Sequence, residues 1–373
     1  MIEYFRHGLL DIGPFLAILT VLVFVHEFGH YFFARLFGVK VEVFSIGFGP
    51  ELFGWNDRAG TRWKFSLVPL GGYIRMFGEG PLAARLPQES ASTLSPPEEA
   101  QSFQSKSLGR RAVIVTGGPA GNFVFAILAL FLLFAVYGRP VTPPEIGQVA
   151  PHSAAAAAGI RPGDMILSID GQPITRFQDI QKAVRPSAGV PLTILVKRGA
   201  RTLTLHATPR STEITDRFGH HLKVGLLGIA HSGVVYVKVK PASALARAAG
   251  ETWNLSAQTL AAFWQMVTGR RSTEDLGGPV RIAQLSGEAA RGGFVAVLWL
   301  LAVLSINLGL INLFPVPVLD GGHLLYYAAE GIRGRPLGQR TQEYGFRIGL
   351  ALVLSLMIFV TWNDLVHHLT WRF

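Results

Sequence analysis

Two histidines and a glutamate stand at a spacing that suits metal-assisted hydrolysis. His26, Glu27 and His30 form a His-Glu-x-x-His pentad. On a helix, His26 and His30 lie one turn apart on one face and can share a metal ion, while Glu27 can take a proton from a metal-bound water. The pattern predicts a metal centre, and the alternative is a pair of amphipathic histidines at a helix end.

The pentad closes an apolar segment, where ionisable side chains are costly. Residues 12–25 contain no Asp, Glu, Lys or Arg, so this segment is expected to be a helix embedded in lipid. Ionisable side chains within such a span are functional by default. The placement therefore favours the metal centre.

A third ligand is required, because a catalytic zinc site combines three protein ligands with an open position for water. The chain has no cysteine, so histidine and carboxylate must supply the ligands. Asp320 follows Pro315 and Pro317, which break a later apolar segment, and such a break is tolerated where it lines a watery cavity. Zinc with two neutral histidines, a carboxylate and a hydroxide carries no net charge. We therefore expect Asp320 as the third ligand, although Asp-Gly-Gly alone is usually a turn.

Asn312 lies just before the same proline break. Its amide could donate a hydrogen bond to the substrate carbonyl as that oxygen becomes an oxyanion. Alternatively, it satisfies backbone carbonyls that the prolines leave free.

Four apolar segments are long enough to cross a bilayer, at least in part. The mean hydropathy of +0.35 and the 16% of charged residues agree with a membrane protein. The segments are residues 12–34, 112–137, 294–314 and 348–362. The first is expected to be a retained span, because no basic segment precedes it and no small-residue cleavage site follows it.

The net charge of +10 is explained by basic loops beside these spans. Lys and Arg are frequent between the first and second spans and recur between the third and fourth, so both loops are expected in the cytoplasm. Residues 138–293 and both termini then lie on the other side. Nucleic acid is not expected as a partner, because no basic helix or basic–aromatic pattern occurs.

Strand periodicity follows the first span. Residues 39–43 alternate apolar and charged side chains, and residues 63–67 and 73–76 alternate on either side of a turn with Pro69. We expect a β-hairpin beside the pentad, either a small cytoplasmic sheet or an edge strand that pairs with an extended substrate. Residues 81–107, rich in Pro, Ser, Ala and Glu, are expected to be a mobile connection.

Residues 145–210 have the character of a compact soluble domain. A strand over 165–169, a helix over 177–184 and a hairpin over 193–205 are expected. The stretch AGIRPGDMILSIDGQPI resembles a PDZ domain, a module that binds extended peptide ends by strand addition. The alternative is a spacer that shields the site without binding peptides.

Two further features lie outside this domain. Residues 245–266 mix apolar and polar side chains, which predicts a helix lying on the membrane or on the other domain. The pairs His220-His221 and His367-His368 are expected at the surface, because adjacent side chains point in different directions.

Five motifs occur in order along the chain: the pentad, SLVPLGGYIRMFGE, GGPAGN (117–122), the PDZ-like stretch and INLFPVPVLDGGH. Together they resemble the site-2 protease family, and within it the bacterial membrane metalloproteases of the sigma-E regulator type. The resemblance implies one Zn²⁺ per chain with ligands His26, His30 and Asp320. It also implies Glu27 as the general base and a functional role for Asn312.

The resemblance further implies a membrane-reentrant β-hairpin near residues 64–76. This makes Gly71, Gly72 and Tyr73 candidate substrate-binding residues. One departure is that the best-known members of this type carry two tandem PDZ domains, whereas one is expected here, so the filtering of substrates by ectodomain size does not carry over.

The resemblance implies an intramembrane zinc endopeptidase that cleaves transmembrane segments of single-pass proteins, such as anti-sigma factors or remnant signal peptides. It would lie in the bacterial inner membrane, with the pentad on the cytoplasmic side and the PDZ domain on the periplasmic side. Expected partners are these substrates, the lipid bilayer and a peptide ligand of the PDZ domain. The alternatives are an inactive membrane-tethered PDZ scaffold and a metal transporter, whose path would need a second polar cluster.

The expected fold is a polytopic α-helical membrane protein with about four transmembrane helices, a membrane-associated β-hairpin and one extracytoplasmic PDZ domain. The expected divisions are 1–35 (first span with the pentad), 36–111 (β region and loop), 112–138 (second span), 145–210 (PDZ domain), 211–293 (linker with amphipathic helix), 294–345 (third span, Asp320 motif and loop) and 346–373 (fourth span).

Overall fold

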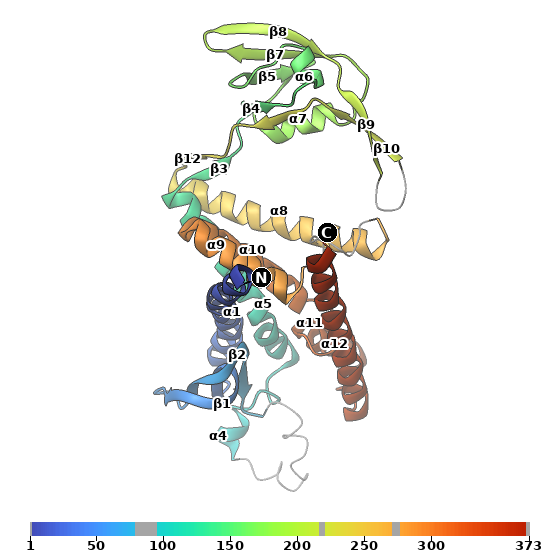
Figure 1. Ribbon diagram of the computed structural model, residues 1–373. Coiled ribbons are helices and arrows are strands. Elements are labelled where there is room, and N and C mark those ends of the chain that lie inside the picture. Colours follow the sequence, from blue (N-terminus) through green and yellow to red (C-terminus); the bar gives the residue numbers. More distant parts are fainter. Residues whose placement is uncertain (1, 79–94, 216–220, 271–276, 371–373) are drawn as a thin grey trace. The chain divides into compact units, whose positions relative to one another are not determined.

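The computed structural model describes residues 2–78, 95–215, 221–270 and 277–370 (Figure 1). The chain divides into two compact units. The first consists of Met1–Leu132, Leu245–Ala261 and Thr273–Phe373. The second consists of Leu133–Ala244 and Ala262–Ser272.

Four helices of the first unit are long and apolar enough to cross a membrane. They are α1 (Ile2–Leu36), α5 (Leu108–Val136), α10 (Phe294–Asn312) and α12 (Gln339–Thr370). Each covers one of the four predicted spans, which confirms a multi-pass helical membrane protein. α12 is longer than the predicted segment 348–362, because its polar ends are also helical.

Further helices pack against the spans. They are α8 (Pro241–Val267), α9 (Pro279–Gly292) and α11 (Asp320–Arg333). The Thr259 hydroxyl of α8 donates a hydrogen bond to Asn307 Oδ1 of α10 at 3.2 Å. Arg291 Nη1 of α9 donates to Asp11 Oδ1 of α1 at 2.7 Å. The predicted helix over 245–266 is thus present, and its middle packs on a membrane span.

The predicted mobile connection over 81–107 is only partly described. Residues 79–94 lie outside the described residues, and a helical turn, α4 (Pro96–Glu99), follows them. The Glu98 carboxylate accepts a hydrogen bond from the Ser95 backbone N–H at 2.9 Å, which caps this turn. His220 and the side chains of His221, His367 and His368 also lie outside the described residues.

The β-hairpin of the first unit consists of two long, bent strands, β1 (Val41–Asn56) and β2 (Arg62–Met76). Phe44 lies opposite both Ile74 and Trp63 in the register, so the first half of β1 runs between the two halves of β2. The sheet therefore has four segments in the order 72–76, 41–46, 62–66 and 51–56. The predicted turn at Pro69 lies within the bend of β2, and residues 72–76 form one edge.

The second unit is rich in β-structure, as predicted for residues 145–210. Its described elements are β3 (Arg139–Val141), β4 (Ile146–Val149), α6 (Ala154–Ala157), β5 (Met165–Ile169), β6 (Gln172–Pro173), α7 (Phe177–Val184), β7 (Leu192–Arg198), β8 (Arg201–Ala207), β9 (Arg210–Thr215), β10 (His221–Leu226), β11 (Ile229–His231) and β12 (Val235–Val237). β5 and α7 have the predicted bounds. A four-stranded sheet has the order β6-β5-β7-β8, and β11 pairs with β4.

The alternation of buried and more exposed side chains along β7 explains the core of this unit. Leu192, Ile194 and Val196 are buried on one face of β7, and α7 covers them with its own buried apolar side chains. The core extends past residue 210, because Leu227 is buried in it and Ile229 packs against it.

One buried ion pair joins the loop before β5 to the end of β7. Asp164 is fully buried, and its carboxylate accepts hydrogen bonds from Arg198 Nε at 2.7 Å and Arg198 Nη2 at 2.8 Å. Arg198 Nη2 also donates to Gly159 O at 2.7 Å. These hydrogen bonds from Arg198 hold the pKa of the Asp164 carboxyl below its ordinary value.

We predict that Arg198→Gln lowers the local stability of the second unit by about 2 kcal/mol, because it leaves a buried carboxylate without its cation. The contribution is present above the ordinary carboxyl pKa of about 4 and is lost as pH falls through the lowered folded-state pKa. Hydrogen–deuterium exchange of residues 145–210 in the full chain measures both effects. Arg201→Gln, an exposed arginine of β8, is the matched control, and equal protection in both variants would contradict the prediction.

Candidate metal centre

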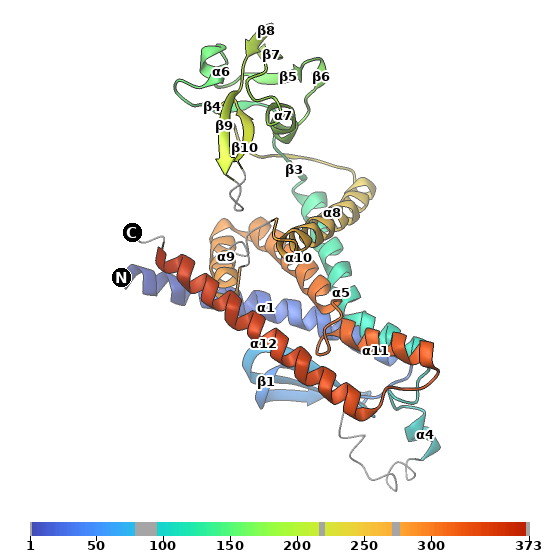
Figure 2. The same ribbon diagram turned by 90° about the vertical axis from the view of Figure 1, so that its right-hand side faces the viewer.

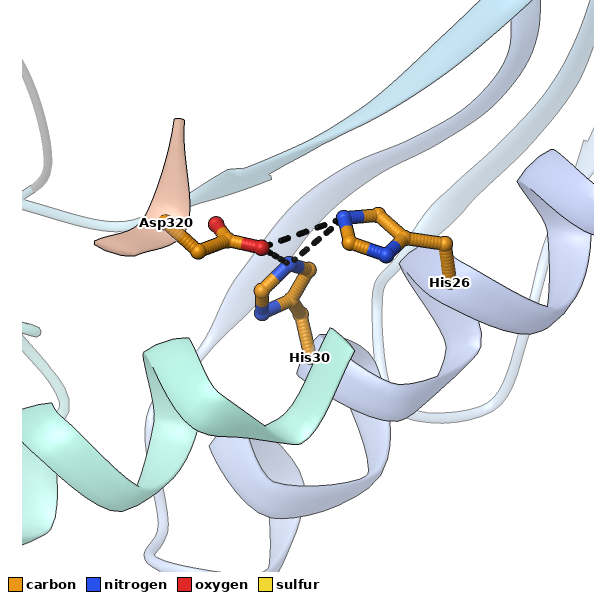
Figure 3. A group of neighbouring side chains, drawn as sticks. All are labelled: His26, His30 and Asp320. Atoms are coloured by element: carbon orange, nitrogen blue, oxygen red, sulfur yellow. Dashed lines mark hydrogen bonds and ion pairs between the residues drawn. The ribbon is translucent and has the colours of Figure 1, made fainter. Parts of the chain in front are cut away.

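The two histidines of the pentad and Asp320 form one buried cluster. His26 and His30 lie one turn apart on α1, and Figure 3 shows both imidazoles directed at the Asp320 carboxylate at the start of α11. His26 Nε2 lies 3.2 Å and His30 Nε2 lies 3.4 Å from Asp320 Oδ2. The two Nε2 atoms are 3.3 Å apart. Two segments almost three hundred positions apart in the sequence thus direct three potential ligand atoms at one point.

The size of this triangle fits a zinc ion. Tetrahedral coordination with bonds of about 2.0–2.1 Å places neighbouring ligand atoms about 3.3 Å apart, and the three observed separations are 3.2, 3.3 and 3.4 Å. Asp320 Oδ2 is buried, and no described residue other than the two histidines offers it a hydrogen bond. Two imidazoles and one carboxylate are also the ligand types of catalytic zinc sites.

A tight reversal brings Asp320 to the histidines. α10 ends at Asn312, and α11 begins at Asp320 after the segment that contains the two predicted helix-breaking prolines. A Cβ on Gly321 would overlap the carbonyl oxygens of Leu313 and Phe314, and a Cβ on Gly322 would overlap that of Val316. The two glycines after the aspartate are therefore required by close backbone packing.

Glycines also bring α5 against the histidine face of α1. A Cβ on Gly29 would overlap the carbonyl oxygen of Gly117, and a Cβ on Gly118 would overlap His30 Nε2. A Cβ on Gly121 would lie 3.0 Å from Val25 O. The glycines of the GGPAGN motif thus let the backbones of α1 and α5 approach closely enough to enclose the imidazoles.

Helix α5 also provides the polar neighbours of both ring Nδ1 atoms. His30 Nδ1 lies 2.9 Å from Ile114 O. His26 Nδ1 lies 3.1 Å from the Asn122 side-chain amide. Sequence reasoning missed both contacts, and only the presence of Asn122 at the end of GGPAGN could have signalled the second.

Glu27 lies between the cluster and the edge of the β-sheet. Its side chain is partly buried and interacts electrostatically with His26, His30 and Asp320. Glu27 Cγ would lie 3.4 Å from a Cβ on Gly72, so the absence of a side chain there leaves room for the glutamate. The structure therefore places a carboxylate beside the cluster and beside strand β2.

The three candidate substrate-binding residues of the hairpin lie at this edge. Gly72 pairs with Ile46 and Tyr73 pairs with Ser45 in the register of β1 and β2. Gly71 has φ +139°, and a Cβ there would overlap the Phe48 ring, which stacks on Tyr73 with centroids 6.2 Å apart. The position requires glycine because both the backbone and the ring exclude a side chain.

Asn312 has a structural contact in this state. Its Nδ2 donates a hydrogen bond to Leu308 O at 3.0 Å, one turn back in α10. Leu308 O lies within α10, so this is a hydrogen bond to the preceding turn of the same helix, and both roles predicted for Asn312 stay predictions.

The far end of α11 is tied to α5. Arg111 Nη2 donates to Glu330 Oε1 at 2.6 Å, and the Arg111 guanidinium lies over the Tyr327 ring at 5.1 Å. Both side chains of the ion pair are largely buried. α5 therefore contacts the helix that carries the histidines and the helix that carries the aspartate.

Comparisons with known proteins show the family to which the chain belongs. The model of peptidase family M50 matches residues 14–356. "Putative zinc metalloprotease Atu1380" of Agrobacterium fabrum is 46% identical over 358 residues, covering 95% of each chain. Metalloprotease MmpA of Caulobacter vibrioides is 36% identical over 381 residues, covering 96% of each.

The solved PDZ domain of the SdrC-like protein from Listeria monocytogenes is also similar, with 21% identity and a TM-score of 0.20. The match covers 24% of this chain and 87% of the Listeria chain.

The fold and the cluster define a membrane metalloprotease, and the chain belongs to peptidase family M50. It is a zinc metalloprotease of that family, which confirms the predicted site-2 protease resemblance.

We predict that Gly118→Ala weakens zinc binding by about tenfold or more, because its methyl group would displace the His30 imidazole. Gly109→Ala is the matched control on the same helix, since a Cβ there meets nothing within 4 Å. Zinc content of the purified full chain, measured by elemental analysis, checks the expectation. Equal zinc content in the two variants would show that this contact does not constrain the imidazole.

Proposed function

We propose that this chain is an intramembrane zinc endopeptidase whose ligands are His26, His30 and Asp320, with one Zn²⁺ per chain. The observation that carries the proposal is the buried triangle of ligand atoms, with edges of 3.2, 3.3 and 3.4 Å, beside helices that can cross a membrane. A zinc ion held there supplies a Lewis acid for the scissile carbonyl and lowers the pKa of water.

Glu27 is proposed as the general base. It follows His26 directly in α1 and lies close enough to all three ligands to interact with them electrostatically. In this position it can accept a proton from the attacking water and deliver it to the leaving amine.

Asn312 is proposed as a hydrogen-bond donor to the developing oxyanion. Its Nδ2 atom donates to Leu308 O in the described state. The proposed role therefore requires a change of side-chain rotamer when substrate binds.

The edge of the β-sheet is proposed to receive the substrate. A transmembrane helix cannot be cut while its carbonyls are hydrogen-bonded within the helix, so it must unwind next to groups that satisfy its backbone. Residues 72–76 form a sheet edge, and Gly72 lies beside Glu27. Gly71, Gly72 and Tyr73 would thus position an extended segment next to the general base.

Exposed apolar side chains on the sheet support a membrane-reentrant hairpin. Leu52 is 62% exposed, Leu67 is 57% exposed and Leu70 is 55% exposed. Such a group of side chains favours lipid or an apolar substrate as its surroundings.

The proposed topology follows from charge. Basic residues between the first and second spans favour the cytoplasm, which places the pentad on the cytoplasmic side of a bacterial inner membrane and the β-rich unit on the periplasmic side. The PDZ-like stretch suggests that this unit binds peptide ends. Single-pass proteins such as anti-sigma factors, or remnant signal peptides, are the proposed substrates.

We predict that Glu27→Gln lowers cleavage of a model single-span substrate by about 10²–10⁴-fold, the usual contribution of a general base. Zinc content should be retained, because Glu27 is not a ligand. His26→Ala should lose both zinc and activity, whereas Glu343→Gln, an exposed glutamate of α12, should lose neither. Full activity of Glu27→Gln would refute its assignment as the base.

We also predict that a substrate segment lies along residues 72–76. The chain contains no cysteine, so a single cysteine can be introduced at Tyr73 in the Glu27→Gln background. Mild oxidation should cross-link it to a cysteine beside the scissile bond of a bound substrate. Leu52→Cys, on the opposite edge segment of the sheet, is the control, and equal cross-linking at both positions would argue against strand addition.

A further inference from the structure

The two candidate histidine ligands are contacted from behind by the same helix. Ile114 and Asn122 are separated by about two turns of α5, and they approach His30 Nδ1 and His26 Nδ1 at 2.9 Å and 3.1 Å. Asn122 is fully buried, and its Oδ1 has no hydrogen-bond partner among the described residues. A buried amide with an unsatisfied oxygen beside a metal site needs a physical explanation.

Metal binding through Nε2 determines what Nδ1 must do. A neutral imidazole that binds a metal through Nε2 carries its proton on Nδ1, and this N–H needs an acceptor. For His30 the acceptor is the backbone oxygen of Ile114. For His26 the neighbour is Asn122, whose nitrogen faces the ring in the structure. The oxygen and nitrogen of a side-chain amide exchange places by a half-turn about the last bond.

We propose that Asn122 is a positioning residue, whose amide oxygen accepts the His26 Nδ1–H and holds the ring with Nε2 toward the metal. This assignment rests on the proposed function, since it requires His26 to be a ligand. In this orientation the oxygen bonds the ring, and the amide nitrogen takes the buried position where the oxygen had no partner. It also makes α5 the source of acceptors for both imidazoles, one from the backbone and one from a side chain.

The surroundings of Asn122 restrict its motion. The Ser305 hydroxyl of α10 donates to Asn122 O at 2.9 Å. A Cβ on Gly309 would lie 3.3 Å from Asn122 Cβ, so α10 also packs closely on this residue. The backbone oxygen and Cβ of Asn122 are therefore packed against α10, while its side-chain amide faces the His26 ring.

The experiment is a zinc competition titration of the detergent-purified full chain with a chromophoric chelator. Asn122→Leu removes the acceptor at similar volume and should weaken zinc binding about 10–100-fold, the usual effect of losing such a partner. The carboxylate of Asn122→Asp can accept from Nδ1–H but cannot donate. The zinc affinity of this variant should therefore be within about threefold of the wild-type value. Asn307→Leu makes the same change at an asparagine that contacts Thr259 instead, and should bind like the wild type.

The outcomes separate this inference from the proposed function. Failure of the wild-type chain to bind zinc would overturn the proposed function, and this inference with it. Zinc affinity unchanged in Asn122→Leu would overturn the inference alone. Should Asn122→Leu fail to fold, Asn122→Asp decides: wild-type affinity supports the amide oxygen as acceptor, and a loss of tenfold or more overturns it.

Discussion

The metal centre depends on the close approach of the α1 and α5 backbones. Gly29, Gly117 and Gly118 lack the side chains that would hold these helices apart. At this distance α5 supplies a neighbour to each ring Nδ1, and both imidazoles are directed at the Asp320 carboxylate (Figure 3). Small residues at helix contacts are a general means of packing in membranes, where no hydrophobic force drives helices together. Here the same contact also supplies a polar partner to each ring.

The position of Asp320 depends on a different constraint. Figure 2 shows that α11 follows α10 after a break in the chain direction. Gly321 and Gly322 allow this reversal to pack against its own carbonyl oxygens, and the Arg111–Glu330 ion pair holds the other end of α11 to α5. Helix α11, which carries the carboxylate at its start, is thus fixed at both ends. This precision matters because displacement of about 1 Å at a reacting centre can cost 10²-fold in rate.

Hydrophobic patterns in the sequence predicted the individual helices and strands whose formation depends on local sequence. The four spans, the helix over residues 177–184 and the strand over 165–169 follow from hydrophobic periodicity. The order of the four segments in the sheet could not be predicted in this way. Phe44 pairs with both Ile74 and Trp63, and periodicity contains no information on the register between distant strands. The pentad and Asp320 were singled out because their types match a known ligand set, and the structure brings His26, His30 and Asp320 together. Asn122 and Ile114 were missed because an amide and a backbone oxygen have no such signature.

Gly72 allows the proposed general base to lie next to the strand edge that would bind an unwound substrate. A side chain there would overlap Ser45 O on one side and approach Glu27 on the other, so the strand edge and the glutamate can be neighbours only where the side chain is absent. A peptide paired with residues 72–76 would have its backbone satisfied by the sheet and its carbonyl next to the carboxylate. Under the proposed function, unwinding and hydrolysis would occur at the same place, and the peptide bond would not be left unpaired in lipid, where each unsatisfied group costs several kcal/mol.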